Sequence, residues 1–161
     1  MVLPGVELST PDGHLLGIWE EDTPTSVIED VLVEVGINRL QHGQLDVNSR
    51  MGMVECANRI NMSGGLAIAA HIEKERGVLR LPVQTHVNEI LASEELSGLE
   101  FVHADTATKV ADKLKPRPCP ALVQGSDCWS VGDSRHALTG IAARRTWIKA
   151  SRPDLCGSRT R

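Results

Sequence analysis

A glutamate and a histidine stand on either side of a predicted turn near the start of the chain. Glu7 lies at the end of the apolar run 2–8, and His14 lies at the start of the run 15–19, with the turn sequence Thr-Pro-Asp-Gly at 10–13. If the two runs pair as strands, the carboxylate and the imidazole face one another at one rim of a sheet. Both groups are ligands for divalent zinc, iron or manganese. Such a pair near a turn is also typical of two solvated loop residues.

Two further candidate ligands follow predicted strands later in the chain. His71 comes directly after the apolar run 66–70, and Asp127 comes shortly after the run 121–124. In parallel α/β sheets and barrels, ligands bind beyond the carboxyl ends of the strands. We therefore predict that these residues converge with Glu7 and His14 at one mouth of a curved sheet. For His71 the alternative is a hydrogen bond to a neighbouring loop, and His42, beside a glycine, is interpreted as a surface residue.

Apolar periodicity predicts the elements that would position these side chains. Runs of strand length and i, i+3, i+4 spacings alternate along most of the chain. We expect helices over 27–35, 49–62, 86–94 and 105–115, and strands over 2–8, 15–19, 66–70, 99–102, 121–124 and 145–149. This order predicts an α/β fold, either a barrel or a barrel-like sheet.

The composition indicates one globular domain with an aliphatic core. The chain has 161 residues, 41% of them hydrophobic, with no tyrosine and a single phenylalanine. A net charge of −4 gives no general attraction to nucleic acid or membrane. No apolar run reaches the ~18–20 residues that span a bilayer, and no cysteines form a CxxC pair, so we predict a cytoplasmic protein without a membrane partner. The basic stretch 144–161 is interpreted as a solvated end, with nucleic-acid binding as the alternative.

The candidate ligands lie within short motifs that resemble the PHP (polymerase and histidinol phosphatase) domain. That family has a Pro-Gly-x-Glu motif, a histidine before a Leu-x-Gly strand, an Ala-His strand end and a late Ser-Asp-x-His. The corresponding sequences are Pro4-Gly5-Val6-Glu7, His14-Leu15-Leu16-Gly17, Ala70-His71 and Ser126-Asp127-Cys128-Trp129. The segment 145–153 resembles the junction of PHP domains that continue into an AAA-like ATPase.

The resemblance implies a partial PHP-type distorted β/α barrel. Residues 1–150 would be the C-terminal portion of a PHP domain, and 151–161 would begin a following segment. Family members hold two or three zinc, manganese or iron ions and hydrolyse phosphoester bonds through a metal-bound hydroxide. Glu7 would bridge metals, and His14, His71 and Asp127 would complete parts of the shell.

Two departures from the family pattern bear on this expectation. The His-x-His strand that opens PHP domains has no counterpart before Pro4, so we expect the chain to be a fragment with an incomplete site. Trp129 stands where the family has the histidine of Ser-Asp-x-His, and an indole N–H cannot coordinate a cation. His136, in the following loop, is the candidate substitute ligand.

Two functions follow from these residues. The first is a metal-dependent phosphoesterase whose substrate is a phosphoester, with nucleotides and nucleic acids among the candidates. The alternative is a catalytically inactive PHP remnant that serves as a structural or partner-binding module of an ATPase.

Overall fold

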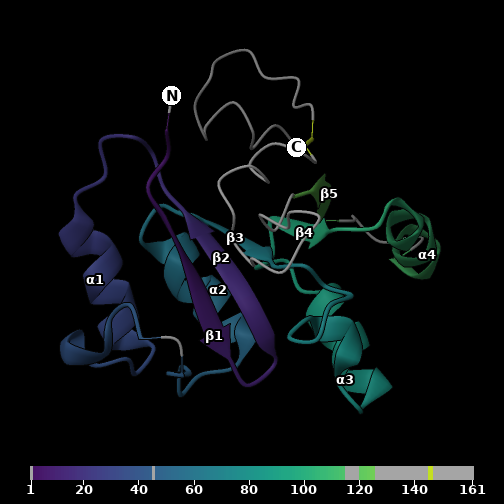
Figure 1. The fold of residues 1–161 in the computed structure, drawn as a ribbon, viewed down its shortest axis with the longest axis horizontal. Coiled ribbons are helices and arrows are strands. Elements are labelled where there is room, and N and C mark those ends of the chain that lie inside the picture. The colour runs from purple at the N-terminus through teal and green to yellow at the C-terminus, as the bar shows by residue number, and fades with distance from the viewer. Residues whose placement is uncertain (1, 45, 115–119, 126–144, 147–161) are drawn as a thin grey trace, which may run out of the picture.

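The computed structural model describes residues 2–44, 46–114, 120–125 and 145–146 as a mixed α/β structure (Figure 1). The mixed α/β class is therefore confirmed. Predictions for Asp127, Trp129, His136 and the basic stretch 144–161 fall largely or wholly outside the described residues. The elements are β1 (Gly5–Thr10), β2 (Gly13–Ile18), α1 (Thr25–Glu34), η1 (Arg39–Gln41), α2 (Met53–Met62), β3 (Leu66–Ala69), η2 (Val78–Arg80), α3 (Gln84–Leu91), β4 (Gly98–Phe101), α4 (Ala104–Leu114) and β5 (Ala121–Gln124).

The strands form a five-stranded sheet in the order β1-β2-β3-β4-β5. β1, β2 and β3 pair antiparallel, whereas β3, β4 and β5 pair parallel. Within the described residues this sheet is open, with β1 and β5 at its edges. α3 and α4 lie in the crossovers that parallel strands require, because a tight turn cannot connect them.

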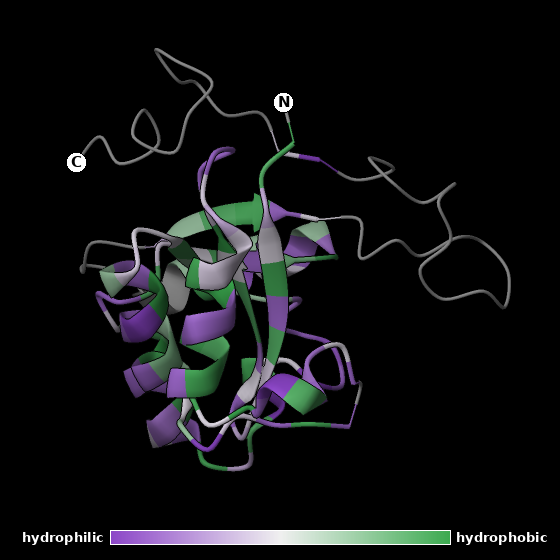
Figure 2. Ribbon diagram, turned by 90° about the vertical axis from the view of Figure 1, so that its left-hand side faces the viewer, coloured by the Kyte–Doolittle hydropathy of each residue, from purple (hydrophilic) through white to green (hydrophobic). Residues whose placement is uncertain are grey.

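One face of the sheet carries the hydrophobic core. The strand register aligns Leu8, Leu15, Ala69 and Leu99 in a row across four strands, and each is at most 2% exposed. Helix α2 packs against β2 and β3 on this core, and α1 contacts α2. Hydrophilic and hydrophobic residues alternate along the helices, as expected for amphipathic helices with one buried face (Figure 2).

Trp19 is a large exception to the predicted aliphatic core. Its side chain is buried, and its indole N–H donates a hydrogen bond to Ser63 Oγ at 3.0 Å. Gly17 and Gly65 make room for the ring: a Cβ atom would lie 2.6 Å from a ring carbon at Gly17 and 2.7 Å from one at Gly65. The core therefore accommodates the Trp19 ring because Gly17 and Gly65 have no side chains beside it.

The start of α2 differs from the sequence prediction. The helix begins at Met53 rather than Ser49, because the Asp12 carboxylate at the tip of the β1–β2 hairpin accepts the Met53 N–H at 2.8 Å. Ser49 instead donates its hydroxyl to Met51 O at 2.7 Å. The side chain that caps the N-terminus of α2 therefore comes from a residue 41 positions before Met53 in the chain.

α1 begins at Thr25, two residues before the predicted start at 27. Pro24 precedes the first helical residue, and no side chain caps the helix. Gly36 follows its last turn with φ +93°, a conformation that favours glycine. Across the described residues, no helix has both the length and the apolar character needed to cross a membrane.

Candidate metal centre

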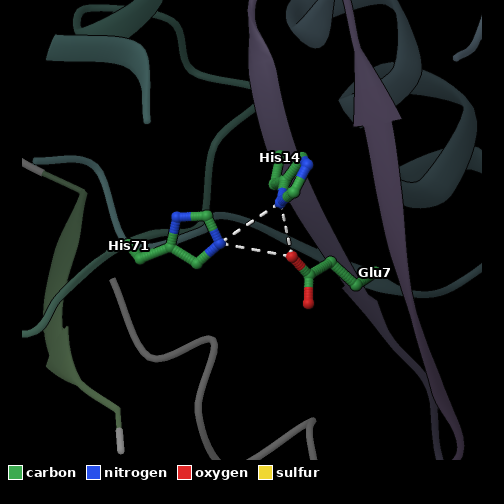
Figure 3. Close-up of side chains that lie close together, drawn as sticks. All are labelled: Glu7, His14 and His71. Carbon is green, nitrogen blue, oxygen red and sulfur yellow. Dashed lines mark hydrogen bonds and ion pairs between the residues drawn. The ribbon is translucent and has the colours of Figure 1, made fainter. Parts of the chain in front are cut away.

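Three of the predicted ligands meet on the face of the sheet opposite the core (Figure 3). Glu7 Oε1 lies 2.6 Å from His14 Nδ1 and 3.2 Å from His71 Nε2. The two histidine nitrogens are 3.3 Å apart, and their rings meet edge to face. Convergence is therefore confirmed for three of the four predicted ligands, on the face of the sheet rather than at the predicted mouth. We call them the triad.

The β1–β2 hairpin positions the first two members of the triad. Glu7 pairs with Leu16, and His14 pairs with Ser9, so the glutamate and the histidine are diagonal neighbours on one face. β1 continues to Thr10, which places Glu7 in the middle of the strand rather than at the predicted strand end. The two side chains therefore lie together on the face of the paired strands and do not face one another across the turn.

The hairpin turn also brings a second loop close to His14. Gly13 has φ +124°, and a Cβ atom at this position would lie 2.5 Å from the carbonyl oxygen of Arg76. With glycine in place, that carbonyl accepts the His14 N–H at 2.9 Å. The loop that carries Arg76 is thus held against the triad through its main chain.

His71 follows β3, as predicted, in a backbone conformation that is rare for its type. Its φ of 27° lies in the left-handed region, which is unfavourable for residues other than glycine. The Glu100 carboxylate accepts the His71 N–H at 3.0 Å, and Glu100 O accepts the next N–H at 2.9 Å. These bonds from β4 hold the buried His71 ring toward Glu7.

The triad maintains Glu7 as a carboxylate. Hydrogen bonds from His14 and His71 hold the pKa of Glu7 well below its usual range, against the opposing effect of burial. An ionised carboxylate and imidazole nitrogens are the donor set that zinc and other divalent transition metals use in proteins.

The spacing of the triad atoms fits a metal ion. Tetrahedral bonds of about 2.0–2.1 Å place ligand atoms roughly 3.3 Å apart. The His14–His71 and Glu7–His71 separations of 3.3 and 3.2 Å already have this value. The Glu7–His14 separation of 2.6 Å is that of a short hydrogen bond, and it must widen when a cation replaces the shared proton. Three protein ligands also leave a coordination position open for water or substrate. The other predicted ligands, Asp127 and His136, lie outside the described residues.

Sequence reasoning missed Arg76, the residue behind His14. Its Nε–H donates to His14 Nε2 at 3.3 Å, and its Nη2 donates to Asn48 Oδ1 at 3.2 Å. Because His14 Nε2 accepts this bond, the ring proton is on Nδ1, the nitrogen that faces Glu7. Arg76 belongs to a charged segment with no distinguishing spacing, so the sequence offered no signal for this contact.

A cavity of about 400 Å³ adjoins the triad. Its polar lining includes Glu7, Ser9, Gln41, His42, Gln44, Lys74, Glu75 and Arg76, and its apolar lining includes Leu32, Ile37 and Val47. His42, interpreted as a surface residue, is half-buried and contributes to this lining, to which the segment after α1 brings it. His42 Nε2 is shielded from solvent and has no hydrogen-bond partner within the described part of the chain.

A second carboxylate–imidazole pair has a structural role. The Asp12 carboxylate, which caps α2, also contacts His86 Nε2 of α3 at 2.8 Å. This contact raises the pKa of His86 above its ordinary value of 6.5. Among the described residues, the pair lacks the third ligand that the triad has, so it links the hairpin tip to two helices.

Comparison of the chain with protein-family models, with curated proteins and with solved structures finds no match.

Proposed function

We propose that this chain is a portion of a PHP-type phosphoesterase that depends on a divalent metal bound by Glu7, His14 and His71. The observation that supports the proposal is the meeting of these three residues. The resemblance of short motifs assigns them as ligands, and His71 lies 64 positions after Glu7 in the chain, yet their donor atoms lie within 3.3 Å of one another. Asp127 completes the ligand set in this proposal, with His136 as the substitute ligand.

Each described residue has a part in the proposed site. Glu7 supplies an anionic oxygen that can bridge metals, and the imidazoles supply neutral nitrogen ligands. When bound, zinc, manganese or iron would act as a Lewis acid on a phosphoryl oxygen and lower the pKa of a water molecule. Lys74 and Arg76, in the cavity lining, would offset charge that develops on the phosphoryl oxygens.

The proposal includes the architecture and cellular setting that the resemblance implies. The parallel strands β3, β4 and β5 would be part of a distorted β/α barrel within residues 1–150, followed by the start of another segment at 151–161. The cysteine pattern, without a CxxC pair, supports a cytoplasmic location.

Metal binding and hydrolysis test the proposal directly. The purified chain is loaded with zinc, manganese or iron, dialysed, and assayed for bound metal and for cleavage of bis(4-nitrophenyl) phosphate. Glu7→Gln should remove both, because it replaces the anionic ligand with a neutral amide of the same shape. Glu34→Gln, an exposed site on α1, is the matched control and should leave both unchanged. Less than one equivalent of metal in the unmodified chain would contradict the proposed site.

The second candidate function is that of a PHP remnant that binds metal without catalysis and acts as a module of an ATPase. Trp129 favours it, because this residue replaces a ligand of the family motif with a side chain that cannot coordinate a cation. Retention of metal together with absence of hydrolysis across phosphomonoesters and phosphodiesters would support this candidate over the enzyme.

A further inference from the structure

Arg76 contacts the triad and contributes to the lining of the same cavity. Its Nε contacts His14 Nε2, on the side of the ring away from Glu7, and its side chain also lines the cavity. Its carbonyl oxygen accepts the His14 N–H, so the loop position is fixed independently of the guanidinium. The side chain can therefore change its contact while the main chain stays in place.

The hydrogen bond from Arg76 is incompatible with a metal on His14 Nδ1. A neutral imidazole has one proton, which now lies on Nδ1 because Nε2 accepts from Arg76. Coordination through Nδ1 requires the lone pair of that nitrogen, so the proton must move to Nε2. Two donors, His14 Nε2–H and Arg76 Nε–H, would then point at one another. A cation in the triad would also repel the nearby guanidinium.

We propose that Arg76 is a lock on the triad: its hydrogen bond to His14 competes with a cation, and cation binding turns its guanidinium from His14 into the cavity, where Arg76 and Lys74 bind a phosphoryl or similar oxyanion group. This inference rests on the proposed metal site and adds a residue that couples the metal to its substrate. The released guanidinium has five N–H donors in a planar fork, a geometry that matches phosphoryl oxygens.

The charge of the cavity supports the oxyanion as its ligand. Among the described residues, the carboxylates of Glu7 and Glu75 balance the cations of Lys74 and Arg76. A divalent cation in the triad adds two positive charges and makes the cavity attractive to a phosphoryl dianion.

The lock predicts that metal and oxyanion reinforce each other's binding. The metal frees the guanidinium that the oxyanion needs, and an oxyanion that holds the guanidinium removes the competitor from His14. By thermodynamic linkage, each ligand raises the affinity for the other by the same factor.

The first test is a calorimetric titration of the full chain with Mn²⁺, which measures the affinity for the metal. Arg76→Gln should tighten Mn²⁺ binding about tenfold, because the variant removes both the competing hydrogen bond and the nearby charge. Lys74→Gln removes the same charge from the same cavity without touching His14, and should give only about a twofold gain. Arg80→Gln, outside the cavity lining, should give none.

The second test repeats the titration with methylphosphonate, a phosphomonoester mimic that cannot be hydrolysed. In the unmodified chain it should tighten Mn²⁺ binding about fivefold or more, and this coupling should shrink in Arg76→Gln. Equal gains in Arg76→Gln and Lys74→Gln would overturn the lock, as would unchanged or weaker Mn²⁺ binding in Arg76→Gln, or an undiminished phosphonate effect in that variant. Failure of every variant to bind Mn²⁺ would instead overturn the proposed metal site on which the lock depends.

Discussion

The two faces of the sheet use neighbouring residues for opposite purposes. On one face, Leu15 packs into a continuous core between strand and helix. On the other face, the adjacent His14 and Leu16 are partly exposed and lie beside Glu7. Because strand side chains alternate, a shift of one residue in register would exchange the two sets. The core that fixes the register therefore also fixes the triad.

The comparison separates the residues that stabilise the fold from those of the candidate site. The covered face consists mainly of aliphatic side chains that pack against α2, and its burial is the main source of stability. The site face has ionisable groups whose contacts are with one another and with two loops. Substitutions on the two faces should consequently have different signatures.

Leu15→Ala should have the largest effect on stability. Leu15 is fully buried, so its truncation removes apolar burial and leaves a cavity, which costs about 3 kcal/mol in the free energy of unfolding. Leu16→Ala, one position along and on the site face, should cost about 1 kcal/mol or less, because its side chain is only partly buried. Urea unfolding of both variants measures the difference. Equal losses would contradict the assignment of the two faces.

Glu100→Ala should affect metal binding more than stability. The Glu100 carboxylate holds the main chain of His71, and loss of a group that orients a ligand typically weakens metal affinity by about 10–100-fold. Glu95→Ala, which removes a carboxylate bonded to Asn58 and Asn61 away from the triad, is the control. Mn²⁺ titration of the two variants should show weakening only for Glu100→Ala, and the same affinity in both would refute the positioning role.

His86 should have the smallest effect, visible as a dependence of stability on pH. Contact with Asp12 raises the folded-state pKa of His86, so its contribution is fully present below the unfolded value near 6.5. The contribution is lost as pH rises through the higher folded-state pKa. The free energy of unfolding of the unmodified chain should therefore exceed that of His86→Gln by more at pH 5.5 than at pH 8.5. A difference independent of pH would exclude this ion pair as the cause.

Local patterns in the sequence were sufficient for the helices and strands from β1 to β5 and for part of the triad, whereas the predicted strand 145–149 lies largely outside the described residues. The strand Ala121–Gln124 was predicted residue for residue, and the four helices were predicted with their types. His71 was identified because it ends an apolar run, which is a local signal. Glu100 was not identified as a residue of the site. Alternation along its strand places it on the same face as His14, but the sequence of a single strand does not show which of its two faces carries the site.

Long-range contacts explain what sequence reasoning missed. α2 begins late because Asp12, distant in the chain, supplies its cap. Arg76 reaches His14 because Gly13 lets two loops approach, and this contact between residues 62 positions apart has no periodic signature in the sequence. His42 enters the cavity only through the return of the chain over β1. Whether the sheet closes further, as the PHP resemblance implies, stays a prediction.

The backbone of His71 has a consequence for how this position can vary. A residue with φ of 27° pays about 1 kcal/mol or more that glycine would not. Selection for thermal resistance alone would therefore drift toward glycine at position 71 and discard the imidazole. In the proposed site, histidine at position 71 would be a trade-off in which stability is given up to keep a ligand, and laboratory evolution for heat tolerance without a metal requirement should reveal it.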